Sequence, residues 1–180
     1  MKTDDEIDKT CEQIHDAFKG WGTNHESLIQ IMGGTLSNER DKISPRYEEL
    51  YSEVLYDRVN KECSGDYGTA MEFLACSPIV AECRMLKAAF RGLGCVKEVV
   101  YSIVCGRSNA DIDSLKKTYS KTFKEDLAKL VSNEIGGDFG KIVSACLKVC
   151  GCTIFLTFTA ACVNRLCSYI QFSLLIPLPG

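Results

Sequence analysis

The stretch KGWGT at residues 19–23 decides the fold of this chain, because it returns as RGLGC at residues 91–95. The same shift of 72 positions takes Tyr47 to Tyr119 and keeps its register over about fifty positions without a gap. Chance matches do not hold one register for so long. An internal repeat of this length indicates two copies of one structural unit, packed together.

The repeat and the charge pattern divide the chain into four parts. We expect a short head at 1–7, one repeat at 8–77, a second at 78–148, and a hydrophobic, Cys-rich tail at 149–180. Arg165 is the only charged residue of this tail, and the uncharged run before it is shorter than the roughly 20 residues that span a bilayer. Three interpretations of the tail stay open: a segment of altered coding origin, a helix that covers exposed repeat faces, or a tail anchor.

The repeats have the patterns of helices. Apolar side chains recur at steps of three and four residues, as in Leu28, Ile29 and Met32 and then in Tyr47, Leu50, Tyr51, Val54, Leu55 and Val59. Thr23 and Glu26 have the spacing of a capping box at a helix start. Gly65 and Gly137 fall where a helix would end with a left-handed residue. Alternating strand patterns are missing from the sequence, so we predict an all-α fold with five short helices in each repeat.

Composition narrows the functions that the chain can have. The formal net charge of −3, without a basic stripe, argues against nucleic acid as a partner and against simple electrostatic adhesion to anionic lipid. The first residues, MKTDDE, are unlike a secretory signal, so we expect a cytoplasmic protein with reduced thiols. The eleven cysteines do not form the paired motifs of a zinc site.

These features resemble the annexin family. Its signature is a basic residue, then Gly-x-Gly-Thr, then an acidic residue about 39 positions after the Thr. Here Thr23 is followed at that distance by Glu62, and Cys95 by Glu134. The resemblance covers residues 8–148, and the Trp-containing loop is closest to plant-type annexins. It implies five-helix repeats, of which typical annexins have four and this chain two. Uncovered repeat faces would then allow self-association.

A Gly-x-Gly loop between helices lets several backbone carbonyls converge, and Ca²⁺ prefers such oxygens together with a carboxylate. The resemblance assigns Ca²⁺ as the cofactor and names two ligand sets: Phe18, Gly20, Gly22 and Glu62 in the first repeat, and Phe90, Gly92, Gly94 and Glu134 in the second. We expect the first site to be the stronger one, because Cys95 replaces the Thr and weakens the helix cap of the second repeat.

Open coordination positions on such a calcium ion would accept a lipid phosphate. The resemblance therefore implies calcium-dependent, peripheral binding to acidic phospholipid membranes, with Trp21, Lys19, Arg91 and Leu93 as membrane contacts. Trp21 could instead pack onto a neighbouring helix, and we expect His25 to be solvated. We expect no catalytic site. The alternatives are a calcium-independent scaffold for cytoskeletal or protein contacts, and a redox role for one of the thiols.

Overall fold

A computed structural model describes residues 2–20, 22–91 and 94–148, and within these the chain forms ten helices and no strand. The first five are α1 (Asp4–Ala17), α2 (His25–Gly33), α3 (Ser37–Tyr51), α4 (Leu55–Glu62) and α5 (Gly65–Leu74). The second five are α6 (Pro78–Ala89), α7 (Lys97–Val104), α8 (Asn109–Phe123), α9 (Leu127–Glu134) and α10 (Gly137–Leu147). The predicted all-α class with two five-helix repeats is confirmed. The interpretations of the tail at 149–180 lie outside the described residues.

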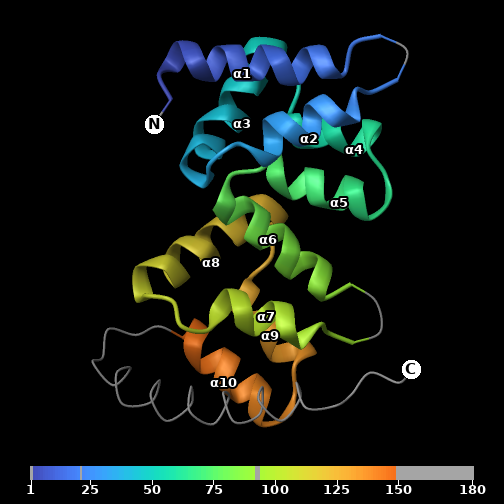
Figure 1. The fold of residues 1–180 in the computed structure, drawn as a ribbon. Coiled ribbons are helices and arrows are strands. Elements are labelled where there is room, and N and C mark those ends of the chain that lie inside the picture. Colours follow the sequence, from blue (N-terminus) through green and yellow to red (C-terminus); the bar gives the residue numbers. More distant parts are fainter. Residues whose placement is uncertain (1, 21, 92–93, 149–180) are drawn as a thin grey trace, which may run out of the picture.

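The two repeats stack end to end, with α6 at the junction (Figure 1). Four of the five helices in the second repeat begin 72 residues after their counterparts in the first. The offset found in the sequence therefore also relates the helices of the two repeats. Most contacts between the repeats come from α3 and α5 on one side and α6 on the other. Across this junction the guanidinium of Arg84 lies 3.4 Å from the centre of the Tyr56 ring, a favourable cation–π contact.

Each repeat has its own hydrophobic core. Tyr47 is fully buried in the first and Tyr119 in the second. The thiol of Cys11 donates to the Ile43 carbonyl at 3.7 Å, and the equivalent Cys83 thiol contacts the carbonyl of Leu115 at the same distance. These two cysteines are therefore small core residues that join the first helix of a repeat to the third.

Glycines shape the corner between the fourth and fifth helices of each repeat. Gly65 and Gly137 have φ values of 67° and 69°, in the left-handed region that was predicted for them. They open α5 and α10, however, and do not end the preceding helices as expected. Three residues further on, a Cβ at Gly68 would lie 2.8 Å from the Cys63 carbonyl, and one at Gly140 would overlap the Ile135 carbonyl. The chain can turn this tightly only because these positions have no side chain.

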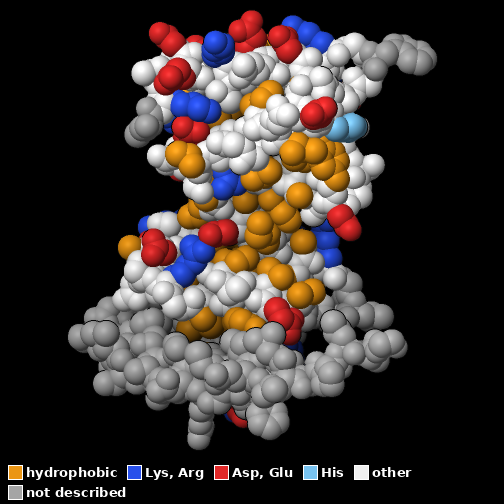
Figure 2. All heavy atoms as spheres, in the orientation of Figure 1, with side chains coloured by type: hydrophobic (Ala, Val, Ile, Leu, Met, Phe, Trp, Pro, Cys, Tyr) orange, Lys and Arg blue, Asp and Glu red, His pale blue; other side chains and the backbone are white. Residues whose placement is uncertain are grey.

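Apolar side chains also gather at the surface. Figure 2 shows them on one face, around the junction of the two repeats. Ile29, Leu36, Leu50 and Val96 are the large hydrophobic residues that are exposed among those described. Self-association through uncovered faces stays a prediction. None of the described helices combines the length and the hydrophobicity that a membrane span requires.

Candidate functional site

The loop between α1 and α2 is built on two glycines. Gly20 and Gly22 have φ values of 99° and 88°, a conformation that other residues adopt only with strain. The space around both is open, so the need for glycine comes from the backbone and not from crowding. A hydrogen bond from the Asn24 N–H to the Ala17 carbonyl, 2.9 Å long, closes the loop. This geometry releases the loop carbonyls from helical hydrogen bonding.

The end of α4 lies against this loop. Thr23 donates its hydroxyl to Glu62 Oε2 at 2.9 Å, although the two residues are 39 positions apart. Glu62 is the last residue of α4 and is partly buried. A half-buried carboxylate therefore stands next to the Gly-x-Gly turn, as a combined carbonyl and carboxylate site requires.

The side chain of Arg58 also lies at this site, and it was not predicted from the sequence. Its Nη2 lies 3.1 Å from Glu62 Oε1 and donates to the Phe18 carbonyl at 3.2 Å. Nη1 is 3.8 Å from Glu53, and the guanidinium lies 5.4 Å from the centre of the Phe18 ring. The four-residue spacing from Arg58 to Glu62 on an expected helix was the available signal.

The second repeat has a similar turn, but its described residues lack the counterparts of the Thr23–Glu62 and Arg58–Glu62 contacts. Gly94 has a φ of 103°, and the Val96 N–H donates to the Ala89 carbonyl at 3.0 Å. Burial raises the pKa of the Cys95 thiol; Lys97 opposes this and Glu134 adds to it. Glu134 itself is exposed and makes no hydrogen bond or ion pair with the residues that the structure describes.

The capping box predicted at Thr23 and Glu26 is wrong. Asn24 is the N-cap of α2, and its side chain accepts a hydrogen bond from the Ser27 N–H at 3.1 Å. The Asn24 carbonyl also accepts a hydrogen bond from the Leu28 N–H at 3.1 Å, so Thr23 lies one position before the N-cap. A capping box does form at the start of α1, where Thr3 and Glu6 exchange the two hydrogen bonds.

A family model described as annexin matches residues 9–74 and 81–146, which together make up most of the chain. The chain belongs to the annexin family.

Among curated relatives, annexin A13 of Homo sapiens is 29% identical over 143 residues, which cover 79% of this chain and 45% of that protein. Annexin Gh1 of Gossypium hirsutum is 29% identical over 137 residues, with coverages of 76% and 44%. Among solved structures, annexin III has a TM-score of 0.72 at 25% identity and covers 81% of this chain and 45% of its own. A calcium-bound annexin (Sm)1 has a TM-score of 0.70 at 23% identity, with coverages of 82% and 44%. This annexin chain thus spans about 45% of the length of the relatives it matches.

The donor set of this annexin fits a hard cation better than a soft one. Among the described residues, no three His, Cys, Asp or Glu side chains lie close enough to hold a metal without help from the backbone. Backbone carbonyls and one carboxylate are oxygen donors, which Ca²⁺ accepts and soft metals do not favour. Phe18, Gly20 and Gly22 lie in the first loop beside Glu62, and Phe90 and Gly94 belong to the second. Gly92 lies outside the described residues.

The residues expected at the membrane are placed in part. Lys19 is exposed and pairs with Asp16 at 2.6 Å, and Arg91 is exposed beside the second loop. Trp21 and Leu93 lie outside the described residues, so both interpretations of Trp21 stay open. His25 is exposed as expected, and its Nδ1 lies 3.3 Å from the Tyr67 hydroxyl.

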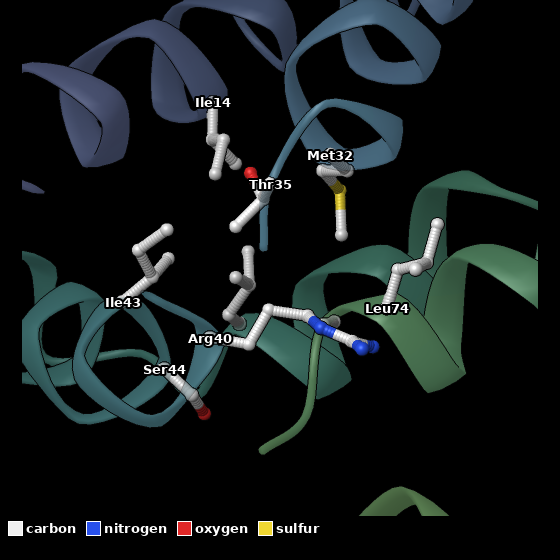
Figure 3. Close-up of a pocket in the computed structure, with 9 residues that line it drawn as sticks. Ile14, Met32, Thr35, Arg40, Ile43, Ser44 and Leu74 are labelled. Atoms are coloured by element: carbon white, nitrogen blue, oxygen red, sulfur yellow. The ribbon is translucent and has the colours of Figure 1, made fainter. Parts of the chain in front are cut away.

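The first repeat also has a small cavity, shown in Figure 3, which is lined by residues of all five of its helices. Its lining is mainly apolar, with Ile14, Met32, Ile43 and Leu74 around the Arg40 side chain. Its volume is about 10 Å³, which is about the room that one water molecule needs. The cavity is therefore a packing defect of the core and not a substrate pocket.

Proposed function

We propose that this annexin chain binds Ca²⁺ in its two Gly-x-Gly loops and uses the bound ions to attach to acidic phospholipid membranes. In the first loop the ligands are the carbonyls of Phe18, Gly20 and Gly22 with the Glu62 carboxylate. In the second they are those of Phe90, Gly92, Gly94 and Glu134. The attachment is peripheral, takes place when cytoplasmic calcium rises, and needs no catalytic site.

The contact between Thr23 and Glu62 carries this proposal. It brings a carboxylate from the end of α4 to a turn whose glycines have positive φ values. A calcium-bound structure among the relatives agrees with Ca²⁺ as the cofactor. One formal charge per site makes the affinity weak without lipid, on the order of 10⁻⁴–10⁻³ M as in low-charge calcium modules.

Charge explains why a cation would be needed as a bridge. The chain has a formal net charge of −3, so an anionic membrane does not attract it as a whole. A divalent ion held by carbonyls keeps most of its positive charge, and a lipid phosphate can replace one of its water ligands. The ends of α1 and α6, from which the two loops start, lie on the same side of the stacked repeats (Figure 1).

Cosedimentation with phosphatidylserine vesicles tests the proposal. We expect the protein to pellet at millimolar calcium and to return to solution with a chelator. Glu62→Gln and Glu134→Gln each remove a carboxylate charge and should raise the calcium needed for half-maximal binding, and the double variant should nearly abolish binding. Glu48→Gln on α3 makes the same change of charge at an exposed position and serves as the control.

A calcium-independent scaffold is the alternative. Equal vesicle binding with calcium and with chelator, or an unchanged calcium curve in the double variant, would contradict the bridging mechanism. Retention of protein contacts without any calcium effect would then favour the scaffold.

A further inference from the structure

Arg58 contacts two of the groups that are proposed as calcium ligands. Its Nη2 atom lies 3.1 Å from Glu62 Oε1 and 3.2 Å from the carbonyl oxygen of Phe18. A single nitrogen therefore binds the carboxylate and one of the carbonyls that the ion would need. A guanidinium and a divalent cation cannot share these oxygens, because both are positive and both require direct contact.

Among the described residues, the second loop has no such competitor. The position equivalent to Arg58 is Leu130, whose side chain has no charge. Glu134 is exposed and is not held by a described residue, and Glu125, which corresponds to Glu53, binds Lys87 at 2.7 and 2.6 Å. Within the described part of the chain, the carboxylate of the second loop can thus bind a cation without breaking an ion pair.

We propose that Arg58 is a built-in competitor of calcium, which raises the calcium requirement of the first loop and leaves the second loop to bind first. This inference rests on the proposed function, since it concerns the same ligands. It reverses the order expected from the sequence, which depended on a capping box at Thr23 that does not form. The residue at position 58 thus sets the calcium threshold of its loop.

A second carboxylate, that of Glu53, lies close enough to pair with the Arg58 side chain. Arg58 is 29% exposed and Glu53, which is 26% exposed, lies 3.8 Å from Nη1. A small rotation toward Glu53 would keep the guanidinium paired while it releases Glu62 and Phe18. Lys61 already contacts Glu53 at 2.9 Å and would share this carboxylate. The competition is therefore reversible and needs no unfolding of α4.

The test isolates the first loop by using Glu134→Gln as the background. In this background, Arg58→Leu gives the first loop the residue of the second. We expect the calcium needed for half-maximal binding to phosphatidylserine vesicles to fall about tenfold, which corresponds to ~1.4 kcal/mol. Such a shift lies between the values typical of exposed ion pairs and of hydrogen bonds to charged groups.

Lys9→Leu on α1 is the matched control, because it removes one positive charge at an exposed position of the same repeat and leaves Glu53, Glu62 and the oxygens of the loop untouched. Its half-maximal calcium should stay within about twofold of the background. Arg58→Gln, which keeps a polar side chain without the charge, replaces Arg58→Leu if circular dichroism shows that the leucine variant is unfolded. The reciprocal Leu130→Arg, in a Glu62→Gln background, should raise the calcium requirement of the second loop.

The outcomes separate the two proposals. Calcium-dependent binding that does not respond to Arg58→Leu overturns the role of Arg58 and leaves the proposed function intact. A rise in the calcium requirement overturns it as well, because Arg58 would then help to bind phosphate. Absence of calcium-dependent binding in the unmodified chain and in every variant sinks both.

Discussion

Gly68→Ala should destabilise the protein although alanine is the better helix former. Gly68 lies inside α5, and a Cβ there would come within 2.8 Å of the carbonyl carbon and oxygen of Cys63. These are backbone atoms, so the corner between α4 and α5 must open to make room. Overpacking of this kind costs ~1–3 kcal/mol, against a gain of ~1 kcal/mol in helix propensity.

The net loss is therefore about 1 kcal/mol, and we expect the midpoint of thermal unfolding to fall by ~2–4 °C in a chain of this size. Circular dichroism at 222 nm measures it. Gly33→Ala is the matched comparison, because Gly33 ends α2 and a Cβ there meets nothing within 4 Å. That variant should be as stable as the unmodified protein or gain up to ~1 kcal/mol.

Gly140→Ala extends the comparison to the second repeat. Its Cβ would overlap the carbonyl oxygen of Ile135, so we expect a greater loss than at Gly68. If Gly68→Ala instead raises the unfolding temperature as Gly33→Ala does, the close approach to Cys63 does not limit the corner. Because Cys63 follows Glu62 directly, the Gly68 variant should also need more calcium for vesicle binding.

Two further predictions concern titratable side chains. Burial lowers the pKa of His15 below its ordinary 6.5, so below pH 6.5 the unfolded chain takes up a proton that the folded chain resists. Urea unfolding should therefore show stability falling between pH 7.5 and 5.5 more steeply in the unmodified protein than in His15→Gln; parallel curves would contradict this. A hydrogen bond from Cys105 lowers the pKa of Cys146 to about 7, whereas burial raises that of Cys83 to about 12. Iodoacetamide should therefore modify Cys146 well before Cys83, as detected by mass spectrometry. The rate at Cys146 should rise through pH 7 and drop in Cys105→Ala. Equal labelling of Cys146 and Cys83 would contradict the lowered pKa of Cys146.

The repeat could be predicted because helix patterns depend on residues close together in the sequence, and here the same patterns occur twice. Helical periodicity around Tyr47 returns around Tyr119, and the glycines of the turns keep the same spacing. The cap of α2 could not be predicted in the same way, since Thr23 and Asn24 are both good N-cap residues. The structure selects Asn24, whose side chain accepts from the Ser27 N–H and whose carbonyl accepts from the Leu28 N–H.

Arg58 is a second case, in which a contact between distant residues could not be predicted from the sequence. Its spacing from Glu62 predicts an ion pair on one helix, but its contact with the Phe18 carbonyl joins positions forty residues apart. Only the packing of α4 against the end of α1 brings these groups together. The candidate oxygen donors could therefore be named from the sequence, whereas the guanidinium that contacts two of them could not.

The start of both loops on one side of the stack affects how the molecule would sit on a bilayer. If the second loop attaches at lower calcium than the first, the chain is initially held at one point and can pivot about the bilayer normal and tilt away from the surface. Attachment of the first loop at higher calcium adds a second point and removes that tilt, so the long axis of the stack then lies along the lipid surface. A graded calcium signal would in this way set the orientation of the molecule as well as the amount that is bound.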